Sequence, residues 1–250
     1  MKLITSISGR IGRLEFAKTK NDKTFVKGSL CVSKSYKKND EWKTIENWFD
    51  FSSFDEAVVN YFKNQAAVGD FLIANAEIAR SKSEKGEFYF LNITKAVSIV
   101  KKDNAKRLYS TNCTYVIGKK YSDFTLSENG WLNGSIGVMT RVKEDGEWKN
   151  TNMWLPLAAN GVIAKRLVDY PKGAELHLEG ELIADNYETK DGKKIKSIRL
   201  SVNRIAGSVD KATNSTNDVE ESTENGFEPD DDTPDFMKAI SNGIGDLPFN

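Results

Sequence analysis

The sequence predicts an all-β fold in which two similar small β-barrels are followed by a disordered acidic tail. Three observations predict this architecture. The first 207 residues contain an internal repeat, each copy is rich in β-branched and aromatic segments between turn residues, and the composition changes sharply from residue 208 onward. We therefore expect domains at residues 1–104 and 108–207 and a tail at 208–250.

The repeat rests on three pairs of matching segments that share one offset of 106 residues. The pairs are VKGSLCV at 26–32 with LNGSIGV at 132–138, EWK at 41–43 with EWK at 147–149, and Trp48 with Trp154. Further on, residues 68–78 parallel residues 172–182 with the offset shortened by two. Matches in one register over about 30 residues indicate two copies of one domain.

Each copy is expected to hold five strands and one helix. The strand-like segments of the first copy are 3–11, 24–36, 42–51, 70–80 and 87–100. The helix lies between the third and fourth strands, with Ser53 as N-cap, Glu56 completing a capping box and Gly69 ending it. Residues 161–173 take the same place in the second copy. The order β-β-β-α-β-β is the plan of an OB-fold barrel, so we predict tandem OB-folds.

The charge is unevenly distributed along a chain whose net charge is zero. The tail carries eleven acids against two lysines, a net charge of −9, and residues 1–207 carry +9. A basic body with an acidic tail is typical of proteins that bind polyanions. The tail also has few core-forming residues, so disorder is expected there.

Few residues are available for catalysis or metal binding. The cysteines, Cys31 and Cys113, are far apart and in no metal-binding spacing, and His177 is the single histidine, within a strand-like alternation. We predict two free thiols, no metal site, no cofactor and no enzymatic activity. No apolar run approaches the ~18 residues that span a bilayer, and the first residues do not resemble a signal peptide. We therefore expect a cytoplasmic protein with no membrane partner.

The third strand of the first copy has a polar face that carries large aromatic rings. Because strands alternate sides, Trp42, Trp48 and Phe54 share this face with acids and hydroxyls. The other face, with Ile45, Phe49 and Phe51, has the character of a core. Large flat rings on a polar face favour stacking with nucleobases. Trp148 and Trp154 occupy the corresponding face of the second copy.

Basic residues accompany these strands in both copies. Lys and Arg neutralise phosphates while aromatic rings hold bases, so we predict a nucleic-acid interface. The basic candidates are Arg10, Arg13, Lys34, Lys43, Arg80 and Lys82 in the first copy and Arg141 in the second.

The first copy resembles the bacterial single-stranded DNA-binding (SSB) family. The resemblance is carried by GRIGR, by TFVKGSLCVSKSY and by EWKTIENWFDFSSFDEAVVNYFKNQAAVGDFLIANAEI, and the second copy is connected to it mainly through the repeat. It implies that Trp48 and Phe54 are stacking residues. Tyr36 falls near another stacking position, but it shares its parity with core residues and would need a bulge to turn outward.

The resemblance also leaves positions open on the hairpin after the fourth strand and in the second copy. A family tryptophan on that hairpin aligns with Ser83, and Phe88 is the candidate to replace it, with Tyr187 at the matching place in the second copy. The second copy has Val142 in place of Tyr36 and Asn160 in place of Phe54, so its share in DNA binding stays open.

The resemblance implies sequence-independent binding and protection of single-stranded DNA in replication, recombination and repair. It further implies a homodimer with four OB-folds and a C-terminal tip that recruits replication and repair proteins, formed by Asp246, Leu247, Pro248 and Phe249 and followed here by Asn250. Two alternatives stay open, namely an RNA-binding OB-fold protein and an accessory protein encoded by a phage or plasmid. The expected location is the bacterial cytoplasm or nucleoid, or the host cytoplasm for a phage protein.

Overall fold

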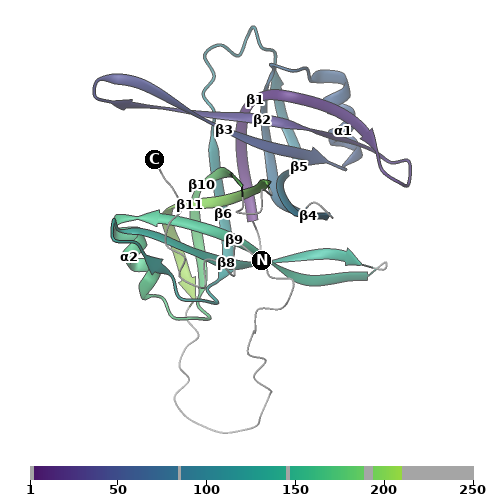
Figure 1. Ribbon diagram of the computed structural model, residues 1–250. Helices are drawn as coiled ribbons and strands as arrows, with labels where there is room; N and C mark the ends of the chain where they lie inside the picture. Colours follow the sequence, from purple (N-terminus) through teal and green to yellow (C-terminus); the bar gives the residue numbers. More distant parts are fainter. Residues whose placement is uncertain (1–2, 84–85, 145–146, 189–193, 210–250) are drawn as a thin grey trace. The chain divides into compact units, whose positions relative to one another are not determined.

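A computed structural model describes residues 3–83, 86–144, 147–188 and 194–209 (Figure 1). These residues form eleven strands and two helices. The first set is β1 (Leu3–Lys18), β2 (Thr24–Lys38), β3 (Glu41–Ser53), α1 (Glu56–Gln65), β4 (Phe71–Ser83) and β5 (Gly86–Val100). The second set is β6 (Asn112–Lys119), β7 (Thr125–Leu126), β8 (Trp131–Glu144), β9 (Glu147–Asn160), α2 (Gly161–Asp169), β10 (Glu175–Glu188) and β11 (Lys194–Val209).

Strands β1 to β5 close into the first barrel. Antiparallel pairs join β1 to β2, β2 to β3, β4 to β5 and β4 to β1, and a short parallel pair at Phe51 and Leu91 joins β3 to β5. Strands β6 to β11 close the second barrel in the same order, with the parallel pair at Leu157 and Leu200. A closed five-stranded barrel with a helix between its third and fourth strands is the OB-fold, so the predicted all-β fold class is confirmed.

The two barrels have matching strand registers. Every β2–β3 pair recurs in β8–β9 at an offset of 106 residues; Leu30 opposite Phe49, for example, matches Ile136 opposite Leu155. The register shifts of β4 at 73–74 and 75–76 recur in β10 at 177–178 and 179–180. Bulges at matching places bend the strands in the same way, so equivalent side chains can be compared between the barrels.

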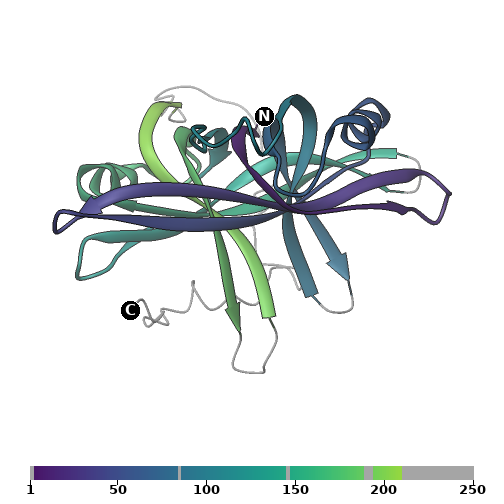
Figure 2. The same ribbon diagram turned by 90° about the horizontal axis from the view of Figure 1, so that it is seen from above.

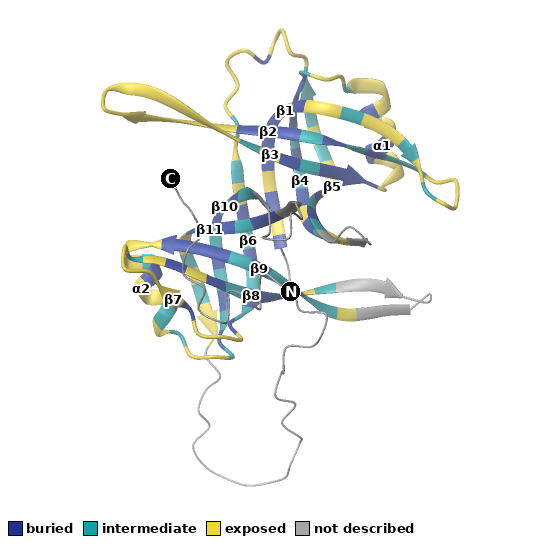
Figure 3. Cartoon of the chain, in the orientation of Figure 1, coloured by how far each residue is buried: buried dark blue, intermediate teal, exposed yellow. Residues whose placement is uncertain are grey.

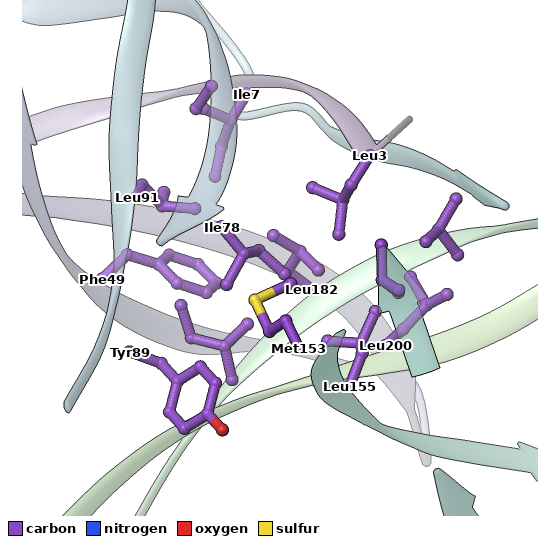
Figure 4. Packing of buried hydrophobic residues seen from close by; sticks show 14 of the residues in the cluster. Leu3, Ile7, Phe49, Ile78, Tyr89, Leu91, Met153, Leu155, Leu182 and Leu200 are labelled. Carbon is purple, nitrogen blue, oxygen red and sulfur yellow. The ribbon is translucent and has the colours of Figure 1, made fainter. Parts of the chain in front are cut away.

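The N-terminal part of β1 has a strand on each side. It pairs with β4 in its own barrel and antiparallel with β6 of the second barrel, where Leu3 lies opposite Val116 and Ile7 opposite Asn112. A single cluster of buried apolar side chains includes residues of both barrels. Phe49, Ile78, Leu91, Leu155 and Leu200 are among its members (Figure 4).

Two local predictions about the first barrel are wrong. Asp55, and not Ser53, caps α1, because its side chain accepts the Val58 N–H at 3.0 Å while the Ser53 hydroxyl donates to the Ile93 carbonyl. The helix also ends at Gln65, four residues before Gly69. Gly69 has a φ of 92° and forms the turn that leads into β4, a conformation that favours glycine.

The hairpin of β2 and β3 extends well beyond the barrel, which explains a further difference (Figures 2 and 3). Phe49 and Phe51 are buried as expected, but Ile45 is 50% exposed although it lies on the same face. The strands continue past the region that the core covers, so alternation no longer separates buried from exposed residues there. We call residues 33–46 the arm.

Neither helix in the described part of the chain is long and apolar enough to cross a membrane.

Candidate nucleic-acid interface

Trp48 lies at the centre of the outer face of β1, β2 and β3, which we call the first-barrel face. It is opposite Cys31 on β2, and its ring lies against Gly12 of β1, where an added Cβ would collide with the six-membered ring. The indole remains 47% exposed, and its Nε1 donates to the Glu46 carboxylate at 3.3 Å. The glycine lets the ring come close to the backbone of β1 while the residue stays partly accessible.

Three aromatic rings lie at regular intervals along β3 and just past its end. Trp42, Trp48 and Phe54 follow one another at six-residue spacing, which is roughly 20 Å in an extended strand. They are 74%, 47% and 42% exposed, respectively. Phe54 stacks on Phe25 of β2, with ring centroids 4.9 Å apart and an angle of 17° between the planes. The described structure therefore holds the predicted rings accessible in one line.

Cations accompany these rings, and several of them are held by carboxylates. Arg13 Nη2 lies 3.5 Å from Asp50 Oδ1, and Lys27 Nζ lies 3.1 Å from Glu15 Oε2. Because these cations remain about half exposed, phosphates can approach them. Lys43 is also exposed, on the arm.

Two other predicted cations bind groups that are distant in the sequence. Arg10 donates to the carbonyl of Ala105 at 3.0 Å and to that of Gly69 at 3.4 Å, so it fastens the segment that links the barrels. Lys34 on the arm lies 2.8 Å from both carboxylate oxygens of Glu181 on β10.

Tyr36 does not share a face with Trp48. The β2–β3 register runs without a shift, and Tyr36 lies opposite Lys43 on the face that also carries Lys34 and Ile45. The bulge that would turn Tyr36 toward the line of rings is therefore absent from this register. Tyr36 is 37% exposed on the other side of the arm.

The remaining predicted residues of the first barrel lie on the hairpin of β4 and β5. Phe88 is half-buried, opposite Ser81, and its backbone pairs with that of Lys196 on β11. Arg80 is exposed on β4, and the side chain of Lys82 lies outside the described residues.

In the second barrel the structure describes one of the four predicted side chains. Trp154 is half-buried, and Tyr121 meets it edge-on with centroids 5.2 Å apart at 72°. The side chains of Arg141, Trp148 and Tyr187 lie outside the described residues, as does the tip Asp246–Phe249.

Sequence reasoning missed two exposed rings of the second barrel. Tyr121 is 37% exposed in the segment between β6 and β7, and Trp131 is 49% exposed at the start of β8, opposite Asn160. Trp131 directly precedes the repeated segment 132–138, and aligning it with Phe25 would have revealed it.

Burial shifts the pKa values of Cys31 and Lys120. Burial, together with the nearby Glu46, raises the pKa of the Cys31 thiol, which makes it a weak nucleophile. Burial also lowers the pKa of Lys120, whose ammonium donates to the carbonyls of Leu167, Val168 and Tyr170 at the end of α2. Among the described residues, no three His, Cys, Asp or Glu side chains gather as metal ligands.

The fold is similar to that of solved SSB proteins. A single-stranded DNA-binding protein from Thermus aquaticus has a TM-score of 0.60 at 11% identity, covering 89% of this chain and 97% of that chain. A deletion variant of the same protein gives a TM-score of 0.60 at 11% identity, covering 90% of this chain and 98% of that chain. No protein-family model matches the sequence, and neither does any curated protein. At this identity the likeness shows a shared fold over most of the chain.

Proposed function

We propose that the protein binds single-stranded DNA without sequence preference and makes or breaks no covalent bond. The observation that carries this proposal is the line of Trp42, Trp48 and Phe54, accessible on one polar face at regular spacing. Every nucleobase offers a π-face, so rings placed in this way can hold a strand of any sequence. The fold shared with SSB proteins supports the same function.

The cations of the first-barrel face complement the rings. Lys27 lies on β2, next to β3, and Arg13 on β1 reaches Asp50 of β3, so both can meet the phosphates that follow each stacked base. Each phosphate contact releases counterions, and log affinity then falls by about 0.7 per contact for each log unit of salt. Duplex DNA binds less well, because its bases are already stacked and cannot reach the rings.

The proposal extends to partners and biological context. We place the protein in replication, recombination and repair, in the cytoplasm, as a homodimer with four OB-folds. Its tip Asp246-Leu247-Pro248-Phe249 recruits partner proteins, since proline stiffens the peptide, phenylalanine fills an apolar pocket and the acids of the tail steer it to basic partners.

The test is a titration of the full-length chain into fluorescein-labelled oligo-dT, followed by anisotropy at several salt concentrations. We expect tight binding at low salt, a linear decrease of log affinity with log salt, and much weaker binding to a duplex of equal length. Trp48→Ala should lower the affinity by roughly 10-fold, since loss of one stacked base costs about 1–3 kcal/mol. Equal affinity for duplex and single strand would sink the proposal, and a matched oligo-U arm separates DNA from RNA preference.

A further inference from the structure

The end of β6 corresponds to the middle of β1, which identifies the equivalent of Gly12. In the first barrel the Ile11 N–H donates to the Asp70 carbonyl and the Ile11 carbonyl accepts from Gly69. Lys120 makes the same two bonds with Ala174 and Gly173. Lys120 therefore takes the place of Ile11, and Tyr121, the next residue, takes the place of Gly12.

The glycine that makes room for an aromatic ring lies on a different strand in each barrel. In the first barrel the glycine lies on β1, as Gly12, and makes room for Trp48. In the second barrel the glycine lies on β8, as Gly137 in the place of Cys31, and an added Cβ there would collide with the ring of Tyr121. Gly137 thus makes room for an extra ring beside Trp154.

A second difference between the barrels lies at the other end of the same face. The first barrel pairs Phe25 with Phe54, whose rings stack. The equivalent pair of the second barrel is Trp131 and Asn160, directly opposite each other in the register. The second barrel therefore keeps a ring at the place of Phe25 and has none at the place of Phe54, and the remaining ring, Trp131, is 49% exposed.

The residues between these rings are small and uncharged. Ser135 lies opposite Pro156 and Asn133 opposite Ala158, whereas the first barrel has Asp50 in the place of Pro156 and Lys27 in the place of Asn133. We call this surface of β8, β9 and Tyr121 the second-barrel face. Its rings can contact bases. Among the described residues of the pairs just named, none is a cation that could contact a phosphate.

We propose that Tyr121 and Trp131 are nucleobase-stacking residues and that, with Trp154, they form a second binding face that makes fewer phosphate contacts than the first-barrel face. This inference rests on the proposed function and assigns residues to it. A strand bound here loses less affinity as salt increases than a strand on the first-barrel face, whose ion pairs are screened.

The test uses a background in which the first-barrel rings are removed, Trp48→Ala with Phe54→Ala, and labelled oligo-dT at low and high salt. In this background we expect a salt slope shallower than that of the unsubstituted chain. Tyr121→Ala and Trp131→Ala should each weaken the remaining binding by roughly 10-fold, and Tyr121→Phe and Trp131→Phe should restore most of it. Tyr109→Ala is the matched control, because Tyr109 is 88% exposed in the segment between the barrels and belongs to neither face.

Photo-crosslinking with 5-iodouracil oligonucleotides gives a second readout, with crosslinks expected at Tyr121 and Trp131. The inference is overturned if both alanine variants bind as their background does, or if the background binds no DNA. It is also overturned if these variants alter the mass of the assembly without altering DNA affinity, since the face then contacts a second copy of the chain. If the unsubstituted chain binds no oligo-dT, the proposed function fails and this inference with it.

Discussion

Thr5 Oγ1 on β1 and Thr114 Oγ1 on β6 lie 3.0 Å apart, and both residues are 0% exposed. The two threonines are also equivalent, because Thr5 lies opposite Ala76 in its own barrel as Thr114 lies opposite Gly180. The hydroxyl pair therefore joins equivalent positions of the two barrels, in the middle of the β1–β6 pairing.

This pair predicts a specific pattern of stabilities. Thr5→Val or Thr114→Val alone leaves a buried hydroxyl without this partner and should destabilise the protein by about 1–2 kcal/mol. Thr5→Val combined with Thr114→Val removes both polar groups and should cost less than the sum of the single variants, by about 1 kcal/mol. Urea unfolding of the four proteins measures this coupling. Additive effects would show that the hydrogen bond contributes nothing of its own.

Replacing Gly12 should weaken the binding of DNA. Gly12→Ala places a methyl group where the Trp48 ring now lies, so the ring must move. We expect a loss of about 1 kcal/mol in the free energy of oligo-dT binding, part of the value of one stacked base. The matched control is Gly207→Ala on β11, where the nearest atoms are 3.8 Å from the added carbon and nothing needs to move. Anisotropy titrations compare both variants, and equal affinities would show that the Trp48 position does not matter.

The stability that Asp70 contributes should be lost at acid pH. Burial tends to raise its pKa, but hydrogen bonds from the Lys101 ammonium and from the Lys102 and Ala67 N–H groups outweigh this and lower the pKa below its usual value. A lowered pKa in the folded state contributes stability above the unfolded pKa of about 3.9, and this stability is lost as pH falls through the folded pKa.

Asp70→Asn should therefore cost about 1–3 kcal/mol at pH 7, and the difference from the unsubstituted chain should shrink below about pH 4. Asp123→Asn is the control, since Asp123 also pairs with a lysine, at 3.0 Å, but its side chain is 76% exposed. Exposed pairs of this kind are worth less than about 1 kcal/mol. Thermal unfolding from pH 3 to 8 tests this, and a difference that is independent of pH would contradict the assigned charge.

The sequence predicted the features that depend on local pattern. Alternation along β3 correctly separated Phe49 and Phe51 from Trp48, because a strand that covers a core must alternate. It failed at Ile45, since the arm leaves the barrel and nothing there distinguishes an inner face. It also could not show that Gly12 lies beneath Trp48, because that contact depends on which strands are neighbours.

The second barrel was harder to predict for a related reason. The glycine and the ring beside it stand at different places in this barrel, with Tyr121 in the place of Gly12 and Gly137 in the place of Cys31. Position-by-position comparison along one strand does not detect such an exchange. Lys120 shows the same limit, as a buried lysine in the place of Ile11 whose partners are the carbonyls that end α2.

The ion pair between Lys34 and Glu181 predicts competition between a carboxylate and DNA. Glu181 holds the Lys34 ammonium at 2.8 Å, and the lysine side chain is 62% exposed, so a phosphate that reaches the ammonium competes with this carboxylate. Glu181→Gln should therefore raise affinity for oligo-dT a few-fold at low salt, and Lys34→Ala should lower it and reduce the salt slope by about 0.7.

The double variant separates these effects. If Glu181 acts by occupying Lys34, then Glu181→Gln in the Lys34→Ala background should no longer raise the affinity, apart from a small general effect of the lost charge. Glu179→Gln is the matched control, because Glu179 lies two residues away on β10 and pairs with Arg204 at 3.3 Å. An equal gain from Glu179→Gln would show that any carboxylate on β10 repels the strand and that the Lys34 pair is not special. Anisotropy titrations at three salt concentrations decide between these results.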